Sequence, residues 1–246
     1  MNVALIDMGS NSIRLAVYKV EQKDFEPIFS KRYMTGLASY VKEKQLTAAG
    51  VEQACIVLLD AKSLLEQLSV DQTTVFATAS LRNIKNTEAV VAAIQQKTGY
   101  TVQILSGHEE AFLDYFGVMH GAPMEEGALV DIGGGSTEIS VSSREKISSL
   151  ESLNIGCVMM TDAFKGNAQG KISSGVFSKM QQRAREKMQH ILKKIERSHY
   201  KAAIASSGTA QALLTLAQAK FGESGGFVQY PEGIELKRSQ IASLAK

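Results

Sequence analysis

The chain has 246 residues, 44% of them hydrophobic and 21% charged, which suits one large or two small globular domains with apolar cores. A net charge of +2 is too small to indicate a protein that binds a nucleic-acid duplex, and no run of about 18 apolar residues predicts a membrane-spanning helix. The N-terminus lacks the pattern of a signal peptide, and the two cysteines stand alone, without metal-binding spacing. We therefore expect a cytoplasmic protein that acts neither on duplex nucleic acid nor at a membrane.

The first half of the chain predicts a sheet with helices packed on it. Apolar runs and alternating patterns indicate the strands, and apolar residues at helical spacing indicate the helices. Thr47 is expected to cap the first helix, and Cys55 is expected in the core beneath it. The strands are predicted at Asn2–Ile6, Ser12–Val20, Phe25–Tyr33, Thr73–Ala77 and Val102–Leu105, and the helices at 47–68, 86–98 and around Glu109–Phe116.

The second half repeats this order of elements after a loop at His120–Gly127. We take that loop as the boundary between a domain at 1–120 and a domain at 121–246. Cys157 is expected in a turn, and the pattern weakens from Phe221 onward. Alternating strands and helices predict an α/β protein with mixed sheets. The strands are predicted at Ala128–Ile132, Thr137–Ser142, Lys146–Leu153 and Lys201–Ala205, and the helices at Ser174–Arg197 and Ala210–Ala219.

Two stretches of the chain are versions of each other. Residues 4–17 read ALIDMGSNSIRLAV, and residues 128–141 read ALVDIGGGSTEISV, so the two align without a gap. Each is an apolar strand, an Asp-X-Gly turn with small polar residues, and a second, alternating strand. Such a duplication predicts two related domains that face each other across a cleft. It would place the carboxylates of Asp7 and Asp131 around one ligand.

The glycine-rich turn after Asp131 has the composition of a phosphate-binding loop. The successive glycines Gly133, Gly134 and Gly135 allow the backbone N–H groups to approach an anion closely, and Ser136 adds a hydroxyl. A carboxylate beside a phosphate is favourable only with a cation such as Mg²⁺ between them, which makes Asp131 a candidate metal ligand. The competing interpretation is a tight hairpin with an Asp cap. The repeat argues against it, because the same arrangement recurs at Asp7.

Side chains around these turns extend the candidate site. Asp7 is a second candidate metal ligand, and Ser10 and Asn11 offer hydrogen bonds where the other copy has glycines. Glu138 is unusual in a hairpin strand and is also expected to face the ligand. The turn Ser206, Ser207, Gly208 and Thr209 lies between a strand and a helix, where it either binds an anion or only caps the helix.

Two further segments contain charged candidates. Glu109 and Glu110 begin a helix, where acidic side chains are favoured by the helix dipole, and one of them could act as a general base. Arg82 follows a strand and could bind phosphate oxygens, although a solvated loop ending in a helix N-cap is an equally simple reading of residues 78–86. Basic residues of the helix at Ser174–Arg197 are interpreted mainly as a solvated face.

The residues above resemble the exopolyphosphatase / guanosine pentaphosphate phosphohydrolase family, which belongs to the actin–hexokinase superfamily. The resemblance covers nearly the whole chain and implies two ribonuclease-H-like (actin-like ATPase) domains with mixed sheets flanking a central cleft. The motifs that carry it are D-x-G-S-N-S at Asp7–Ser12, S-L-R at Ser80–Arg82 with Asn86, S-G-x-E-E-A at Ser106–Ala111, D-I-G-G-G-S-T-E at Asp131–Glu138, G-C-V at Gly156–Val158 and S-G-T at Ser207–Thr209.

What the resemblance implies is release of terminal orthophosphate with Mg²⁺ or Mn²⁺ as the cofactor. Glu110 would activate the attacking water, Asp131 and Glu138 would bind metal or position water, and Arg82 would neutralise developing charge. The glycine amides would hold the phosphate from one side, and Ser10 and Asn11 would hold it from the other.

The substrate is expected to be inorganic polyphosphate or guanosine pentaphosphate, because both end in the same phosphoanhydride. A non-catalytic sensor that binds polyphosphate or an alarmone is the alternative from another functional class. Homodimerisation is a family expectation. Members of the family continue with an R-A-D motif and further helices, so we expect the second domain, which ends here at Lys246, to be short or truncated at its C-terminus.

Overall fold

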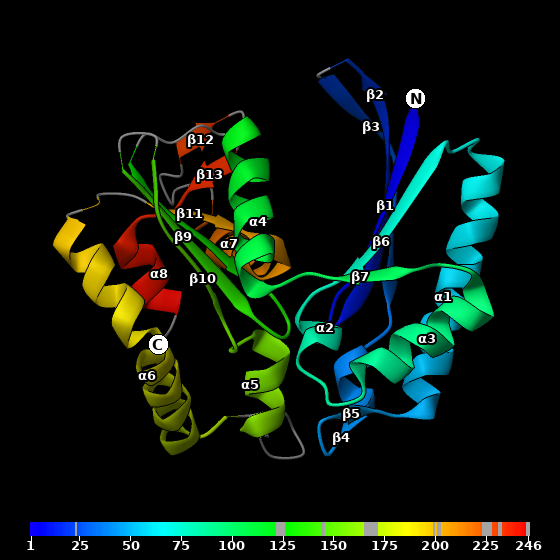
Figure 1. The fold of residues 1–246 in the computed structure, drawn as a ribbon. Helices are drawn as coiled ribbons and strands as arrows, with labels where there is room; N and C mark the ends of the chain where they lie inside the picture. The colour runs from blue at the N-terminus through cyan, green and yellow to red at the C-terminus, as the bar shows by residue number, and fades with distance from the viewer. Residues whose placement is uncertain are drawn as a thin grey trace. The chain divides into compact units, whose positions relative to one another are not determined.

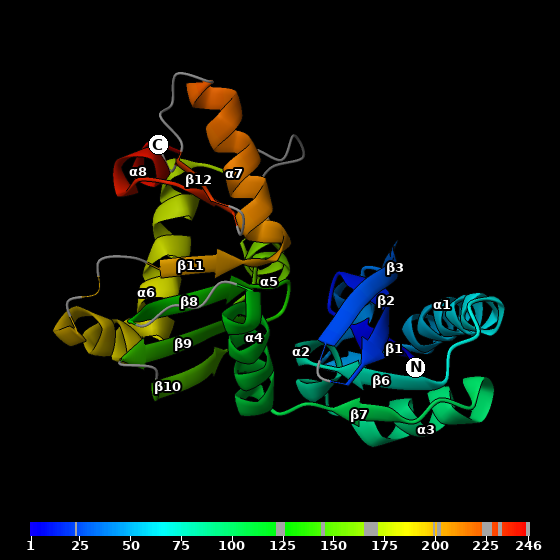
Figure 2. The same cartoon turned by 90° about the horizontal axis from the view of Figure 1, so that it is seen from above.

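The computed structural model of the protein forms two compact units. One consists of Met1–Gly107 and Val158–Gly166, and the other of His108–Cys157 and Asn167–Lys246. The segment 122–125, within the loop where the sequence places the domain boundary, lies outside the described residues, so that boundary stays a prediction. Figures 1 and 2 show the elements of each unit. The described residues are 1–22, 24–121, 126–143, 146–164, 172–198, 200, 203–222, 228–230 and 233–244.

The first unit is built on a five-stranded sheet in the order β3-β2-β1-β6-β7. The pairs β1–β2 and β2–β3 are antiparallel, whereas β1–β6 and β6–β7 are parallel, so the sheet is mixed as predicted. Each strand predicted for this half is confirmed to within a few residues. The bounds are β1 (Asn2–Met8), β2 (Ser12–Glu21), β3 (Asp24–Met34), β6 (Gln72–Ala77) and β7 (Val102–Ile104).

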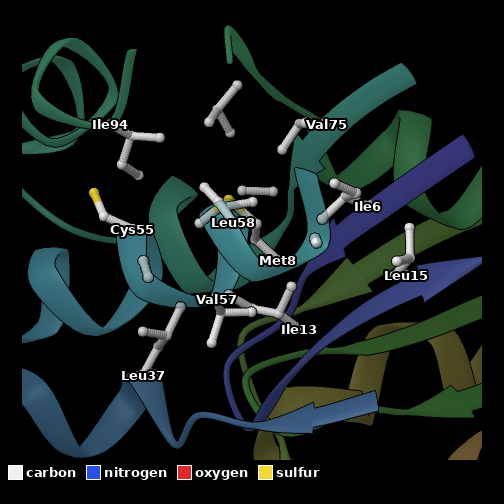
Figure 3. Packing of buried hydrophobic residues seen from close by; sticks show 14 of the residues in the cluster. Ile6, Met8, Ile13, Leu15, Leu37, Cys55, Val57, Leu58, Val75 and Ile94 are labelled. Carbon is white, nitrogen blue, oxygen red and sulfur yellow. The ribbon is translucent and has the colours of Figure 1, made fainter. Parts of the chain in front are cut away.

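Two helices, α1 (Ala48–Gln67) and α3 (Thr87–Thr98), form the core of the first unit together with the sheet. The predicted cap of α1 is confirmed, because the Gly50 N–H donates to Thr47 Oγ1 at 3.3 Å. Cys55 is buried on the same helix, as expected. Figure 3 shows Leu58 of α1 beside Met8 of β1 in this cluster. The apolar residues of β1 and α1 therefore fix the strand that carries Asp7.

Short elements connect the sheet and helices of the first unit. They are the 3₁₀ helix η1 (Leu37–Tyr40), the strands β4 (Val41–Lys42) and β5 (Gln45–Leu46), and the one-turn helix α2 (Ala79–Arg82). Asn86 precedes α3, but its side chain makes no cap. Instead, its amide exchanges two hydrogen bonds of 3.0 Å with the backbone of Leu46. Asn86 is therefore tied to the backbone of β5 and does not cap α3 with its side chain.

The second unit has a four-stranded sheet in the order β10-β9-β8-β11. The strands β8–β9 and β9–β10 pair antiparallel, and β8–β11 pair parallel. This order repeats β3-β2-β1-β6 of the first unit, so the sequence repeat corresponds to a repeat of topology. The bounds are β8 (Gly127–Ile132), β9 (Thr137–Ser143), β10 (Lys146–Leu153) and β11 (Ala203–Ser206).

Helices α4 (Gly107–Gly121) and α6 (Ser174–Ser198) pack on opposite faces of this sheet (Figure 1). Ser140 on β9 donates to the Ala111 carbonyl of α4 at 3.1 Å. On the other face, Glu151 of β10 contacts both His190 and Lys194 of α6 at 3.1 Å. The face of the sheet that α4 covers is therefore polar, and this face carries the residues of the candidate site.

The C-terminal part of the described chain adds α7 (Ser207–Phe221), β12 (Val228–Tyr230), β13 (Gly233–Glu235) and α8 (Arg238–Leu244). The prediction that Cys157 lies in a turn was wrong, because it is the first residue of α5 (Cys157–Ala163). None of the helices in the described ranges has the length and apolar character that a membrane crossing requires.

Ser142 on β9 is fully buried, and its Oγ has no hydrogen-bond partner among the described residues. A buried hydroxyl without a partner destabilises a protein by about 1–3 kcal/mol. We therefore expect Ser142→Ala to raise the free energy of unfolding by about 1 kcal/mol, measured by urea denaturation. Ser140→Ala serves as the matched control and should lower it by about as much, since that hydroxyl is bonded. Loss of stability in both variants would contradict the conclusion that the buried Ser142 hydroxyl lacks a hydrogen-bond partner.

Candidate active site

Two carboxylates lie side by side on the sheet of the second unit. Asp131, near the end of β8, is directly opposite Glu138 on β9 in the antiparallel register. Directly opposite residues project from the same face of a sheet, with their Cβ atoms about 5 Å apart. Only 3% of Glu138 is exposed, and Asp131 is half-buried. The predicted pair of acidic side chains is therefore brought together within one unit.

The electrostatics of Glu138 bring in a third carboxylate. Burial and then the negative charge of Glu110 raise the pKa of Glu138 to about 7, with a smaller contribution from Asp131. Hydrogen bonds from the Ser152 and Ser136 side chains act in the opposite direction. Glu110 belongs to the first turn of α4, which packs on this face of the sheet. The three acidic residues predicted as catalytic thus form one interacting group.

Asp131 is also held by hydroxyl groups. Ser206, the last residue of β11, donates from its Oγ to Asp131 Oδ2 at 2.9 Å. Burial raises the pKa of Asp131, and the hydrogen bond from Ser206 partly offsets that effect. Both carboxylates therefore occupy a partly desolvated site, where a bound cation would be strongly favoured.

The glycine turn between β8 and β9 has the same geometry as its copy in the first unit. The Gly133 N–H donates to the Ser136 carbonyl at 3.0 Å, and the Gly9 N–H donates to the Ser12 carbonyl at 3.0 Å. A Cβ on Gly133 would stand 3.2 Å from the Ser136 carbonyl oxygen, and a Cβ on Gly9 would stand 2.9 Å from that of Ser12. The repeat found in the sequence is thus a repeat of turn structure.

A second segment supports the glycine turn from behind. The Cys157 N–H donates to the Gly133 carbonyl at 3.0 Å. Gly156 packs so closely that a Cβ there would stand 2.4 Å from the Gly134 carbonyl oxygen and 2.6 Å from the Gly135 nitrogen. The glycine turn can follow its path only because Gly156 has no side chain.

The Ser207–Thr209 motif forms the first turn of α7, so the helix starts three residues earlier than predicted. Ser207 and Thr209 both donate their hydroxyls to the Ile132 carbonyl, at 3.1 and 2.7 Å. Ser207 also has a φ of +92°, which is unusual for a residue with a side chain. Because the hydroxyls are engaged, this turn would offer an anion its backbone N–H groups, which helix geometry leaves without intrahelical partners.

The first unit carries the other predicted residues on and beside its own turn. Ser10 is buried, whereas Asn11 is exposed, and their carbonyls accept hydrogen bonds from the Ala38 and Gly36 N–H groups at 2.9 and 2.8 Å. In the register, Asp7 lies opposite Arg14 on β2, at the position that Glu138 occupies in the second unit. The two copies therefore differ in charge at the same structural position.

Arg82 ends the one-turn helix α2, which follows β6 directly. Its Nη1 donates to the Leu105 carbonyl at 2.9 Å, just beyond β7. Ser80 of the same helix donates from its hydroxyl to the Met8 carbonyl at the end of β1. These bonds tie Arg82 to the strand ends of the first unit. Its predicted role in neutralising phosphate charge stays a prediction.

Asp131 and Glu138 are suited to bind Mg²⁺ together with water and phosphate oxygens, but not to enclose the ion with protein ligands alone. Among the described residues, no three His, Cys, Asp or Glu side chains are placed so that they could enclose a metal ion by themselves. Mg²⁺ commonly binds one or two carboxylates and completes its octahedron with waters and substrate phosphate oxygens. Asp131 and Glu138, opposite each other beside the glycine turn, match that mode of binding.

The sequence matches the family model of the Ppx/GppA phosphatase family over residues 16–239. The chain belongs to the Ppx/GppA phosphatase family.

Solved structures of this family have the same fold. A structure of an exopolyphosphatase from Cytophaga hutchinsonii superposes with a TM-score of 0.82 at 22% identity, covering 91% of this chain and 72% of that chain. The Aquifex aeolicus PPX-GPPA enzyme superposes with a TM-score of 0.69 at 26% identity, covering 90% of this chain and 71% of that chain. The predicted fold class, ribonuclease-H-like (actin-like ATPase) units with mixed sheets, is confirmed.

Sequence reasoning missed several residues at the sites of this Ppx/GppA protein. Ser152 and Ser206 bond the two carboxylates. Ser152 gave no signal in the sequence, and Ser206 was predicted only as part of a turn that binds an anion or caps a helix. Gly156 was noted only as part of a motif, and its close packing depends on a contact between distant segments. Arg14 could have been found, because it is the residue that aligns with Glu138 in the repeat.

The burial of Glu138 predicts how the stability of this Ppx/GppA protein depends on pH. Its pKa is raised from an ordinary 4.5 to about 7, so between these values the folded protein binds more protons than the unfolded chain. Without metal, the contribution of Glu138 to the free energy of unfolding should therefore fall by roughly 3 kcal/mol as pH rises from 4.5 to 7, and then level off. Glu138→Gln cannot titrate, so urea denaturation should show a smaller fall. Equal falls in both proteins would contradict the burial of a titrating carboxyl.

Proposed function

We propose that this protein hydrolyses the terminal phosphoanhydride of inorganic polyphosphate and releases orthophosphate. The observation that carries the proposal is the interacting group of Glu110, Asp131 and Glu138 beside a turn of three glycines. Phosphoryl transfer requires positioning and charge stabilisation more than covalent chemistry. Acidic residues next to amide-rich turns supply those functions. Membership of the Ppx/GppA phosphatase family supports the same conclusion.

In the proposed reaction, Glu110 acts as the general base. It accepts a proton from a water molecule whose oxygen attacks the terminal phosphorus. The bond between that phosphorus and the bridging oxygen breaks, and the bridging oxygen leaves with the shortened chain. The N–H groups of Gly134 and Gly135 would bind the oxygens of the terminal phosphate. The prediction that the Gly133 N–H also binds phosphate is corrected, because that N–H donates to the Ser136 carbonyl and closes the turn. Ser136 donates to Glu138 and helps to hold that carboxylate in place.

Asp131 and Glu138 are the residues of the second unit that would hold Mg²⁺ or Mn²⁺. When bound, the ion would neutralise charge on the phosphates and on the two carboxylates. The burial of both side chains supports this assignment, because uncompensated carboxylates are unfavourable in a desolvated site. Asp7 as a further ligand, and Ser10, Asn11 and Arg82 as phosphate contacts, are proposed from the sequence motifs.

The test is orthophosphate release with Mg²⁺ from long polyphosphate, short polyphosphate and guanosine pentaphosphate, assayed side by side. We expect release from polyphosphate, with Glu138→Gln and metal-free protein inactive as controls. Faster release from guanosine pentaphosphate would instead identify a 5′-phosphohydrolase, which breaks the same type of bond. No release from any substrate, with binding retained, would overturn the hydrolase proposal and indicate a polyphosphate or alarmone sensor.

A further inference from the structure

One polar residue from each strand of the second sheet forms a continuous row. In the register, Ser152 on β10 is opposite Glu138 on β9, Glu138 is opposite Asp131 on β8, and Asp131 is opposite Ser206 on β11. Residues at matching positions of neighbouring strands project from the same face of the sheet. The row therefore consists of two carboxylates in the centre and a serine at each end.

Each serine donates its hydroxyl to the carboxylate next to it. Ser152 Oγ bonds Glu138 Oε1 at 2.7 Å, and Ser206 Oγ bonds Asp131 Oδ2 at 2.9 Å. Both lengths are typical of well-formed hydrogen bonds to a carboxylate oxygen. Because Glu138 is only 3% exposed, bulk water offers little substitute for the bond that Ser152 makes. The two bonds restrict the rotation of both carboxylates from opposite ends of the row.

Ser206 bonds Asp131 although it occupies the N-cap position of a helix. Ser206 is the N-cap residue of α7, where a serine oxygen ordinarily accepts a hydrogen bond from the first turn of the helix. Its side chain makes no such cap and is directed to Asp131 instead. The hydrogen bond that the Ser206 side chain makes here is therefore directed to the site and not to the helix.

We propose that Ser152 and Ser206 are positioning residues that hold Glu138 and Asp131 in the orientation needed for hydrolysis. The inference rests on the proposed function and extends it to residues outside the glycine turn and the three acidic side chains. Neither serine touches substrate in this assignment, and each acts through the carboxylate that it bonds. Small displacements of catalytic groups, of the order of 1 Å, lower rates by as much as about 100-fold.

The experiment compares Ser152→Ala and Ser206→Ala with Ser152→Thr and Ser206→Thr in orthophosphate release from polyphosphate. We expect the alanine variants to lose about 10- to 100-fold in kcat with little change in KM, because orientation is lost while phosphate binding is kept. The threonine variants retain a hydroxyl and suit a strand, so they should recover most of the rate. The alanine and threonine variants of each pair should differ in kcat by at least fivefold.

Ser148→Ala is the matched control, since it removes a hydroxyl of the same sheet that bonds the Val141 carbonyl and no carboxylate. It should lose stability as Ser152→Ala does, yet keep the wild-type kcat. Wild-type kcat in both alanine variants, or threonine variants as slow as alanine variants, would overturn the positioning role while leaving the hydrolase proposal intact. A wild-type protein that releases no orthophosphate would overturn both.

Discussion

Replacing Glu110 by glutamine is expected to lower kcat for orthophosphate release by about 10²- to 10⁴-fold, the usual contribution of a general base. Glutamine keeps the size of the side chain and a hydrogen-bonding oxygen but cannot accept the proton of the attacking water. Binding of polyphosphate should be retained or slightly strengthened, because one negative charge of the site is removed. The measurement is steady-state kinetics together with equilibrium binding of polyphosphate.

The adjacent Glu109 provides a matched control for this variant. Successive helix residues point about 100° apart, so Glu109 and Glu110 face different directions from the first turn of α4. Glu109 is exposed, and Glu109→Gln should change kcat by less than about threefold. Equal losses in the two variants would show that the acidic helix start matters as a whole. A fully active Glu110→Gln protein would exclude Glu110 as the base.

Adding a single methyl group at Gly156 is expected to impair both folding and catalysis. The Cβ of Gly156→Ala would stand 2.4 Å from the Gly134 carbonyl oxygen, a distance that requires the backbone to move. We expect a loss of about 1–3 kcal/mol in the free energy of unfolding. Displacement of the glycine turn should in addition lower kcat/KM by about 100-fold. Urea denaturation and kinetics on the same preparation would measure both effects.

Gly117 on α4 is a suitable control for the substitution, because a Cβ there would have no atom within 4 Å. Gly117→Ala removes the helix-destabilising effect of glycine and should raise stability by about 0.5–1 kcal/mol with unchanged activity. Should Gly156→Ala behave like Gly117→Ala, the close packing behind the glycine turn would not be required for function.

The parts of the fold that follow from local pattern could be predicted from the sequence. The strands around both Asp-X-Gly turns, and α1 with its Thr47 cap, have apolar spacing that survives in the structure. Shorter elements could not be found in this way. In α2 and α5, four and seven residues are too few to establish a helical period. The path of those segments is set by tertiary bonds such as Ser80 to the Met8 carbonyl.

In the candidate site, too, some features could be predicted from local sequence and others depend on tertiary contacts. Asp131 and its glycine turn could be proposed from composition and repetition, because the chemistry of phosphate restricts which residues can bind it. The near-complete burial of Glu138 depends on α4 covering its strand, and the bond from Ser206 depends on the parallel pairing of β8 and β11. Both are contacts between segments that are distant in sequence, and no local pattern encodes them.

The most direct test of the proposed reaction is hydrolysis of polyphosphate of defined length in ¹⁸O-labelled water, with the released orthophosphate analysed by mass spectrometry. Attack of water on the terminal phosphorus predicts one ¹⁸O atom in each orthophosphate and a chain shortened by one phosphate. Release of unlabelled orthophosphate would place the attack at another phosphorus. Tight binding of polyphosphate without any orthophosphate release would contradict the account as a whole.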